Sequence, residues 1–503
     1  MKLLSPALLS AGLFLATFSF AQPTGTIAFD ETTPYSHGFR KIIKTSDGGL
    51  LAIGSAGPNG RVTKLNASFA QVWSLAMDSM PFLDLAETND GNYVLLGMTL
   101  NAAYNSAPCI LKLTPAGVTV YQKTYYSSAS GNQFYADGLC KAAGSDNGFL
   151  LFGGNCVAMD YLMKCDVNGN ISWQQQYAGT GNGAFAQVIP VSNGYTGIFN
   201  CMQNSVASIG ILNVDASGNV QWCKVMQSAN GVAPVRNTLV QKNNGDYYFT
   251  VSPYDVNGLQ NYTVSANGST VTCKRHVTGS QMSLTSVTAT GNANDETLIT
   301  GMINTAFYLK VDAADDIVYQ KTYGSLLSSE FNGCAKMGNG TYALCGSSSW
   351  DGKVVALVDE NGNGACNPGN ASFTTAAHSF TLTSPSLTVF PVNAQVTSLN
   401  HMFYAVTQAQ TTLCGTVSVP GQESMPAEVS VYPNPAEELI FIGVSKGEMR
   451  SLRLRNALGQ VCIAEKKVSD VAARLELSGL PAGVYFLEVN CGERVIVRKI
   501  TKR

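Results

Sequence analysis

The sequence predicts an all-β protein in which a closed ring of repeated sheets precedes a small β-sandwich. Three observations support this fold class. Short runs that alternate apolar and polar residues recur along the chain and are bounded by Gly, Asn or Asp, which is typical of strands joined by tight turns. One turn-and-strand pattern recurs seven times, and the composition changes near residue 421. That change indicates two differently built units.

The first 21 residues have the features of a cleaved secretory signal peptide. Lys2 gives a cationic start, an apolar run covers residues 7–20, and small residues occupy positions 19 and 21, where a signal peptidase requires them. We expect the mature chain to begin at Gln22. A membrane anchor is the alternative, but about 14 apolar residues are fewer than the roughly 20 that span a bilayer.

In each of the seven repeats, a turn rich in Gly, Asn and Asp is followed by an apolar strand. These strands begin at Leu50, Tyr93, Phe149, Tyr195, Tyr247, Thr297 and Tyr342. Their mean spacing of about 49 residues is typical of a four-stranded propeller blade. A second hairpin follows, and its last strand usually carries an aromatic residue. The aromatic positions are Trp73, Tyr121, Trp173, Trp222 and Tyr319, with Cys273 as the exception.

The seventh repeat has a third strand but no good fourth strand after it. Residues 25–39 match the missing pattern, with Phe29 in the position of the aromatic. Residues 22–366 are therefore predicted to form a seven-bladed β-propeller closed by its N-terminal strand, because closure removes exposed sheet edges. A solenoid is the alternative, and it would need capping repeats at its ends.

Residues 367–421 fit no repeat, since they are rich in Ser, Thr and Val with almost no charge. We expect an extra strand pair or an extended linker here. Cys366 and Cys414 bracket the segment, and a disulfide between them is a hypothesis that an exported chain permits. The 13 cysteines of the chain leave one odd and the connectivity open.

Residues 422–503 carry 12 Lys+Arg and 10 Asp+Glu, a much higher charge density than the preceding 400 residues. Their strands alternate with period 2 and end at Gly, Pro or Asn. This pattern predicts a compact sandwich of about seven short strands, of the Ig-like class.

Four motifs of this tail resemble the type A C-terminal sorting domain of the Bacteroidota type IX secretion system. They are YPNP at 432–435, NALGQ at 456–460, LPAGVYF at 480–486 and the basic pair at 498–499. The resemblance implies that the sorting signal includes Pro433, Asn434, Pro435, Gly459, Gly483 and Tyr485. It also implies export through the type IX machinery, then removal of the tail by a sortase-like peptidase, with release or attachment to surface lipopolysaccharide.

The charge and motif content exclude several classes of function. A net charge of −2 without a Lys/Arg-rich run argues against nucleic acid, because phosphate neutralisation needs a basic surface. The four histidines share no i, i+4 spacing, so a zinc signature is missing. No nucleophile elbow, Walker loop or dinucleotide fingerprint is present. We predict no catalytic residue, no metal ligand and no cofactor.

Calcium is an open alternative at three turns, which begin at Asp166, Asp215 and Asp359. Each lacks part of the calcium-loop pattern, and each occupies a hairpin turn where Asn, Asp and Gly are favoured anyway. We therefore interpret all three as ordinary turns.

The innermost strands offer the best candidate site. An ungapped alignment of these strands places six polar residues in one equivalent column: Lys41, Asp84, Asp137, Gln187, Asn237 and Ser286. Such a ring could hold a polar ligand or an ion over the propeller axis. The alternative is a water-filled axis whose polar groups satisfy one another. Tyr125, Tyr126 and Tyr135 could stack on sugars, although core packing or surface scatter is the favoured interpretation.

These observations predict an exported, non-catalytic binding protein of the cell surface or the extracellular medium, with a glycan or protein ligand. One alternative is a polysaccharide-active hydrolase or lyase that uses Asp84 and Asp137, which would require two carboxylates close together in a cleft. A surface scaffold without a small ligand is the third hypothesis.

Overall fold

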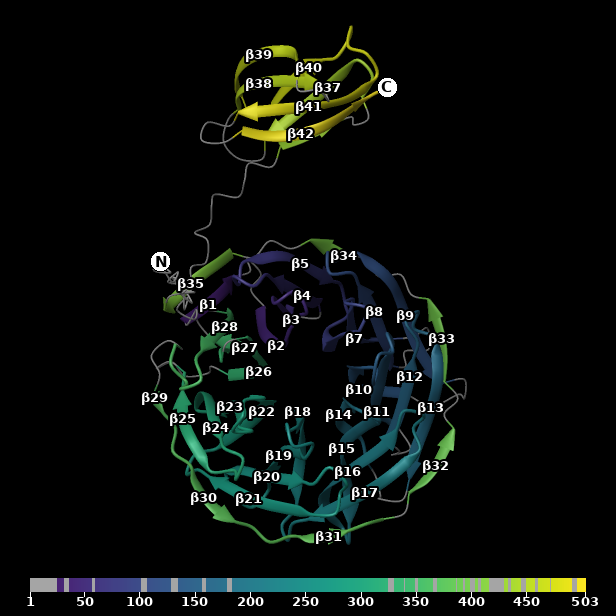
Figure 1. Cartoon of the computed structure of the whole chain (residues 1–503), viewed down its shortest axis with the longest axis vertical. Helices are drawn as coiled ribbons and strands as arrows, with labels where there is room; N and C mark the ends of the chain where they lie inside the picture. Colours follow the sequence, from purple (N-terminus) through teal and green to yellow (C-terminus); the bar gives the residue numbers. More distant parts are fainter. Residues whose placement is uncertain are drawn as a thin grey trace, which may run out of the picture. The chain divides into compact units, whose positions relative to one another are not determined.

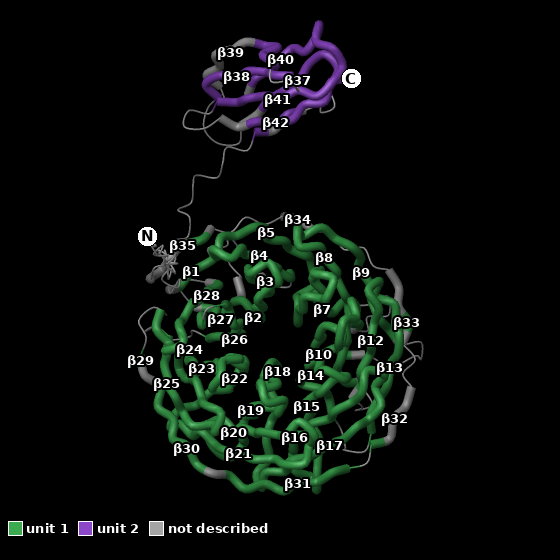
Figure 2. The backbone as a smooth tube through the Cα atoms, in the orientation of Figure 1, with its two compact units in different colours: residues 1–419 green, residues 420–503 purple. Residues whose placement is uncertain are grey.

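The chain, seen in a computed structural model, divides into two compact units, residues 1–419 and 420–503 (Figure 2). The structure describes residues 25–30, 36–56, 59–100, 106–127, 134–155, 160–178, 183–323, 330–338, 340–348, 352–364, 369–385, 387–391, 394–398, 403–405, 409–415, 429–432, 436–444, 449–456, 460–470, 472–490 and 495–503. Every element within these ranges is a β-strand, which confirms the predicted all-β class. None of them holds a helix with the length and hydropathy of a membrane span. The signal peptide expected over residues 1–21 lies outside these ranges.

The first unit consists of seven antiparallel sheets of five strands each, arranged around a central opening (Figure 1). Sheet 1 contains β2 (Ser36–Lys44), β3 (Leu50–Ala56), β4 (Asn59–Leu65), β5 (Gln71–Met77) and β34 (Phe403–Ala405). Sheet 2 contains β6 (Phe82–Glu87), β7 (Tyr93–Leu100), β8 (Ser106–Leu113), β9 (Thr119–Ser127) and β33 (Ala394–Ser398). Sheet 3 contains β10 (Phe134–Lys141), β11 (Phe149–Asn155), β12 (Asp160–Cys165), β13 (Ile171–Ala178) and β32 (Thr388–Pro391).

The remaining four sheets repeat this order. Sheet 4 contains β14 (Phe185–Val191), β15 (Gly194–Gln203), β16 (Val206–Asp215), β17 (Val220–Gln227) and β31 (Thr381–Thr383). Sheet 5 contains β18 (Val232–Gln241), β19 (Tyr247–Pro253), β20 (Gly258–Val264), β21 (Val271–Val277) and β30 (Thr374–Ala377). Sheet 6 contains β22 (Met282–Ala289), β23 (Thr297–Ile303), β24 (Thr305–Val311), β25 (Ile317–Thr322) and β29 (Gly369–Asn370). Sheet 7 contains β26 (Glu330–Lys336), β27 (Tyr342–Ser348), β28 (Gly352–Val358), β1 (Gly25–Asp30) and β35 (Ala409–Gly415).

The first strand of each sheet lies toward the centre and is called here its inner strand: β2, β6, β10, β14, β18, β22 and β26 (Figure 1). Each inner strand contacts the inner strand of the next sheet, and β26 contacts β2. The apolar core lies between neighbouring sheets, as in the cluster that joins Ile53 and Val62 of sheet 1 to Phe82 and Leu95 of sheet 2. The packing of each sheet therefore depends on its two neighbours.

Sheet 7 combines strands from three parts of the chain, because β1 pairs with β28 on one side and with β35 on the other. The register corrects one sequence-based assignment. The aromatic lies opposite the residue two positions before the turn that follows the third strand, as Trp73 lies opposite Lys64 and Trp222 lies opposite Asn213. In sheet 7 this position belongs to Gly25, which lies opposite Leu357, whereas Phe29 lies opposite Lys353.

Residues 369–415 form seven short strands, β29 to β35, and are called here the belt. Each belt strand adds a fifth, outermost strand to a different sheet, and the chain visits the sheets in reverse order, from sheet 6 down to sheet 1 and then to sheet 7 (Figure 1). This segment therefore supplies extra strands, as one of the two alternatives expected, but it supplies seven of them on seven sheets and not a single pair. Since a four-stranded sheet leaves an unpaired outer edge, the belt covers seven such edges.

In five of the seven sheets, the aromatic residue of the fourth strand packs against a turn of the next sheet. Trp73 donates its indole N–H to the carbonyl oxygen of Pro115 at 3.0 Å, in the β8–β9 turn of sheet 2. Gly117 of that turn has φ +79°, and a Cβ there would lie 3.1 Å from the Trp73 ring. Only glycine can adopt this positive φ and also leave room for the Trp73 ring without strain. The same aromatic-on-turn contact recurs for Tyr121, Trp173, Trp222 and Tyr319.

The second unit holds seven strands in two sheets. One sheet contains β36 (Val429–Tyr432), β37 (Leu439–Val444) and β40 (Ala472–Glu476). The other contains β38 (Met449–Asn456), β39 (Val461–Asp470), β41 (Gly483–Asn490) and β42 (Val495–Lys502). Their buried residues form a single core that draws on both sheets, with Ile440 from one and Leu487 from the other.

Of the predicted sorting-signal residues, Gly483 begins β41 and Tyr485 is buried within it. The Tyr485 hydroxyl donates to the carbonyl oxygen of Pro481 at 2.7 Å, which fixes the turn before the strand. Pro433, Asn434, Pro435 and Gly459 lie outside the described residues.

Candidate ligand-binding site in the central channel

Every inner strand contains a β-bulge at an equivalent place. In six of them one residue has no partner on the neighbouring strand: Arg40, Leu83, Asp137, Ala186, Thr285 and Asn332. In β18 the bulge is wider, because residues 235–238 all lie opposite Thr250. A bulge re-aims the side chain that it carries. These positions are called here the bulge ring.

All seven positions of the bulge ring line one cavity of about 700 Å³, and Arg236 and Asn237 represent the wide bulge of β18. This volume lies within the range of about 300 to 1,000 Å³ that small-molecule sites occupy. Because the ring draws one position from every inner strand, the site exists only when the seven sheets are assembled.

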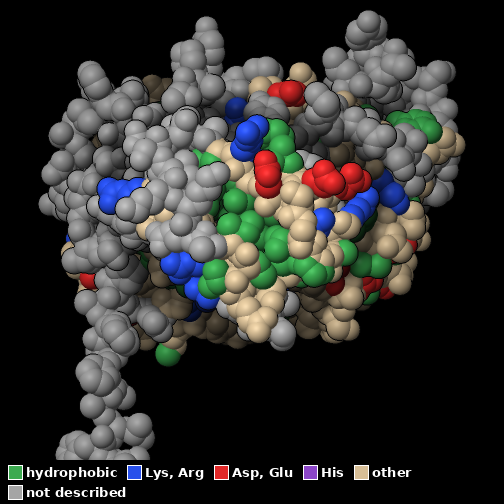
Figure 3. Space-filling view, turned by 90° about the horizontal axis from the view of Figure 1, so that it is seen from above, with side chains coloured by type: hydrophobic (Ala, Val, Ile, Leu, Met, Phe, Trp, Pro, Cys, Tyr) green, Lys and Arg blue, Asp and Glu red, His purple; other side chains and the backbone are tan. Residues whose placement is uncertain are grey.

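The cavity lining carries more positive than negative charge. Its cationic residues are Arg40, Lys41, Lys44, Lys141 and Arg236, and its acidic residues are Asp84, Glu87 and Asp137. The outer face shown in Figure 3 differs from the cavity lining, because acidic and basic side chains lie beside one another there, around hydrophobic ones. The lining is therefore a place where an anionic group is favoured.

Asp84 connects three sheets. Its Oδ1 accepts the ammonium of Lys41 from sheet 1 and the backbone N–H of Leu85, and its Oδ2 accepts the N–H of Leu139 from sheet 3 at 2.9 Å. The residue is 5% exposed. A Cβ at Gly138 would lie 2.6 Å from Oδ2, so the glycine of β10 makes room for this carboxylate. Asp84 thus links the inner strands of three sheets, and its carboxylate has little hydrogen-bond acceptor capacity left for a ligand.

Gln187 connects sheets 4 and 5 in the same way. Its Oε1 accepts the N–H of Leu239 at 2.6 Å, and its Nε2 donates to the carbonyl oxygen of Leu239 at 3.1 Å. Farther around the ring, Thr285 donates to the carbonyl oxygen of Phe331, and Asn332 donates to that of Phe39 at 3.1 Å. Several polar groups of the channel therefore satisfy backbone groups of the next sheet.

Arg236 and Asp137 form an ion pair between sheets 5 and 3. Burial raises the pKa of the Asp137 carboxyl, and the opposing effect of Arg236 is smaller. Arg40 is an exposed residue, yet partial desolvation of its guanidinium lowers its pKa; the positive charge of Arg236 adds to this effect and Asp84 opposes it. Arg40 makes no ion pair with any described residue. The lining thus holds one paired and one unpaired guanidinium.

The predicted column is only partly correct. Lys41, Asp84, Asp137, Gln187 and Asn237 line the cavity, whereas Ser286 is buried and does not. The register also separates two kinds of position. Lys41, Asp84 and Gln187 follow the bulge, whereas Asp137 lies in it.

Sequence reasoning missed Arg40, Arg236 and Asn332, because the column that it selected holds the residue that follows each of them, and a bulge has no distinct sequence pattern here. β18 has 10 residues against 6 to 9 in the other inner strands, in keeping with the wide bulge that carries Arg236.

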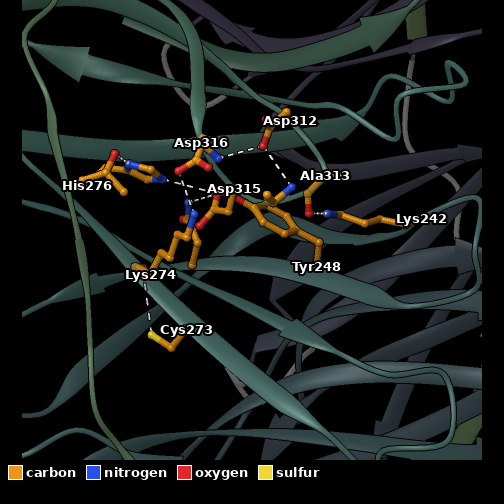
Figure 4. Close-up of polar contacts among 12 residues, drawn as sticks. Lys242, Tyr248, Cys273, Lys274, His276, Asp312, Ala313, Asp315 and Asp316 are labelled. Atoms are coloured by element: carbon orange, nitrogen blue, oxygen red, sulfur yellow. Dashed lines mark hydrogen bonds and ion pairs between the residues drawn. The ribbon is translucent and has the colours of Figure 1, made fainter.

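A second polar cluster is buried between sheets 5 and 6 (Figure 4). Asp315 has φ +64° in the β24–β25 turn, where five of the six corresponding turns have glycine. It accepts the hydroxyl of Tyr248 at 2.7 Å and the amide of Asn261 at 2.8 Å, and it lies 3.3 Å from Nε2 of His276. His276 in turn contacts the Thr375 hydroxyl of the belt at 2.9 Å. Sheet 5 has Cys273 instead of the large aromatic, and here a polar network joins the neighbouring sheets.

The three turns considered for calcium use their carboxylates internally. Asp166 Oδ1 accepts the N–H groups of Asn168 at 2.9 Å and Asn170 at 2.7 Å, and Asp215 and Asp359 do the same in their turns. Within the described ranges, no group of three or more His, Cys, Asp and Glu side chains could hold a metal ion.

The tyrosines considered for sugar stacking are scattered. Tyr125 is fully buried and donates to the carbonyl oxygen of Gly169 at 2.9 Å, Tyr126 is half-buried, and Tyr135 is 41% exposed.

The proposed disulfide lies outside the described residues, because Cys366 is not described and the side chain of Cys414 is not either. Cys165 and Cys345 are buried free thiols in strands, as expected for small apolar fillers.

Residues 430–503 match the family model of the secretion system C-terminal sorting domain. The chain is a type IX secretion substrate. Such a substrate is exported, so the protein is secreted or placed on the outer cell surface, and its tail engages the secretion machinery. No curated protein matches the sequence of this substrate.

Three solved structures give weak likenesses to this secretion substrate. A Dos1 propeller is 12% identical with a TM-score of 0.41, over 68% of this chain and 84% of that one. A structure from a study of two prolyl endopeptidases is 11% identical with a TM-score of 0.43, over 85% and 55%. A protein of unknown function from Bacteroides caccae is 8% identical with a TM-score of 0.33, over 67% and 91%. All three scores are below 0.5, so the likenesses carry no argument about function.

Proposed function

We propose that this secretion substrate is a non-catalytic binding protein whose first unit is a seven-bladed propeller, closed by β1, with its ligand site in the central channel. The seven five-stranded sheets, the contact of β26 with β2 and the pairing of β1 with β28 support the closed ring. We further propose that the mature chain begins at Gln22 and that the tail is an Ig-like domain which a sortase-like peptidase removes after export.

One observation carries the binding role. The bulge ring sends a side chain from every inner strand into a cavity of about 700 Å³, and most of the polar groups around it are engaged in fixed contacts between sheets. A site whose groups are held in place needs little reorganisation when it binds a ligand. A glycan is the ligand that we favour, and a protein segment inserted into the channel is the second candidate.

A polysaccharide-active hydrolase or lyase is favoured by one specific observation. The raised pKa of Asp137 would help this carboxyl to keep a proton, as a general acid must. Glycosidases, however, need a second, available carboxylate, and Asp84 accepts three donors that belong to the ring itself. The contacts of Asp84 therefore favour binding over catalysis.

The full chain should be tested on a glycan array and, in parallel, in a polysaccharide-cleavage screen. Binding without product is the expected result. Product release would overturn the proposal, and Asp137→Asn would then be the first variant to examine. If the chain neither binds a glycan on the array nor releases product in the cleavage screen, the glycan role would also be overturned and a surface scaffold would be favoured.

A further inference from the structure

The bulge ring places two guanidinium groups on the same cavity, Arg40 from sheet 1 and Arg236 from sheet 5. Asp137 is the acidic member of the ring. Arg236 pairs with its carboxylate, although the two residues are 99 positions apart in the sequence. Arg40 stays without an ion pair among the described residues. The ring therefore carries two positive charges against one negative charge.

The electrostatics of Arg40 favour an anionic ligand. Arg40 is an exposed residue that lines the cavity, and the nearby positive charge of Arg236 disfavours the charged form of its guanidinium. An anion placed between the two arginines would offset this repulsion. Guanidinium groups bind carboxylates and other oxyanions through paired N–H donors. The site thus has the donors and the charge that an oxyanion requires.

The lining also argues against a neutral sugar. Sugar rings commonly stack on exposed aromatic faces. Among the described residues that line the cavity, Phe152 is the only aromatic one, and it is 2% exposed. Polar side chains line the cavity in place of exposed aromatic rings. Asn237 of the wide bulge lines the cavity with φ +59°, and non-glycine residues held in this region are concentrated at functional sites.

We propose that the channel binds an acidic saccharide, whose carboxylate lies between Arg40 and Arg236 and whose hydroxyl groups meet Asn237 and the neighbouring lining. This inference rests on the proposed function and names its ligand class. A sulfated saccharide would present the same oxyanion chemistry. Asp137 competes with the ligand for Arg236 and therefore limits the affinity.

Two variants change the affinity in opposite directions. Arg40→Gln removes one charged donor that the ring itself does not use, and we expect binding of the acidic saccharide to weaken about tenfold or more. Asp137→Asn removes the competing negative charge, and we expect binding to become several-fold tighter. Arg450→Gln is the matched control, because Arg450 is an exposed arginine of the second unit, and it should change nothing.

The test is a calorimetric titration of the full chain with uronate-containing oligosaccharides and with the same oligosaccharides after reduction of their carboxyl groups. Sulfated oligosaccharides form a further arm and separate the two sources of the oxyanion. We expect the reduced forms to bind at least tenfold more weakly, and raising the salt concentration to weaken only the acidic forms. Melting temperatures of the variants verify that each one folds.

Two results would overturn the inference while the proposed function stands. The first is equal binding of the acidic and reduced oligosaccharides, and the second is acidic binding that Arg40→Gln leaves unchanged. Absence of binding by every saccharide would overturn the proposed glycan role together with the inference. Tighter binding by Asp137→Asn without product formation would support both.

Discussion

Buried lysines form a residue-level feature that recurs in four of the seven sheets. Lys64, Lys112, Lys164 and Lys310 are each at most 5% exposed, and each pairs with an acidic residue of the first turn of its own sheet. A buried ammonium group must be paired, because an isolated charge costs too much to desolvate. These pairs therefore fix the turn between the first two strands of the sheet.

The pair of Lys112 and Asp90 predicts an acid-sensitive stability. Burial acts to raise the pKa of Asp90, but hydrogen bonds from Lys112, Thr88 and Asn92 outweigh it and lower the pKa to about 2. A carboxyl whose folded pKa is depressed stabilises the fold above its ordinary pKa, and this contribution is lost as the pH falls toward the folded value. We expect urea midpoints to fall between about pH 4 and pH 2.

In Asp90→Asn, the midpoint should be lower at pH 7 and should depend less on pH within that window. Parallel acid titrations of the two proteins provide the measurement. An identical slope in both would show that Asp90 does not contribute.

The buried carboxylate of Asp315 predicts a large mutational effect. Asp315→Ala leaves the donors of Tyr248 and Asn261 without their acceptor, so we expect the free energy of unfolding to fall by roughly 2 to 4 kcal/mol. The neighbouring Asp316 pairs with Lys274 at the surface and is the control. Asp316→Ala should cost less than about 1 kcal/mol. Urea denaturation of both variants tests this difference, and equal losses would contradict it.

At the scale of the elements, the contact between an aromatic residue and the next turn explains why the repeats have glycine there. Sheet 1 departs from this pattern, because its turn has Phe69 at φ +64° and the aromatic position of the preceding sheet is Gly25. Phe69 is buried in the same cluster as Ile27 and Phe29 of β1. The belt also holds this turn, since the Gln410 amide donates to the carbonyl oxygen of Phe69 at 3.0 Å and accepts the N–H of Gln71 at 3.0 Å.

A pair of glycine variants separates backbone strain from this contact. Gly91 and Gly117 have φ of +76° and +79°, but a Cβ at Gly91 meets nothing within 4 Å, whereas one at Gly117 lies 3.1 Å from the Trp73 ring. Gly91→Ala should cost about 1 kcal/mol. Gly117→Ala should cost about 1 to 2 kcal/mol more, because the ring must also shift. Thermal unfolding of the two variants measures the difference, and equal costs would mean that the contact is unimportant.

The sequence predicted those elements whose signals are local. The seven turns and their spacing predicted the strands of each sheet, and the unmatched strand at residues 25–30 predicted the pairing with the last repeat. The belt was missed as a continuous set of sheet edges, because its strands are as short as 2 residues and each pairs with a strand far away in the chain. The bulge ring was missed because one extra residue moves the side chains that follow it to the other face, and the sequence does not mark where this residue is inserted.

At the scale of the molecule, the belt completes the first unit by covering the outer edge of every sheet. Exposed edge strands pair readily with other chains, so deletion of residues 367–415 should make the protein self-associate and should lower its melting temperature. Light scattering and thermal unfolding, each beside the unaltered full chain at the same concentration, provide the comparison. A monomeric deletion variant with an unchanged melting temperature would show that the belt is dispensable.

The central claim is that an exported protein binds its ligand at the bulge ring of the channel. Arginine-selective labelling with phenylglyoxal, read by mass spectrometry of peptides from the full chain with and without a saccharide that it binds, tests this claim most directly. We predict that the bound saccharide protects Arg40 and Arg236 from labelling and leaves the exposed Arg450 of the second unit unprotected. Unchanged labelling of Arg40 and Arg236 in the presence of saturating ligand would contradict the account.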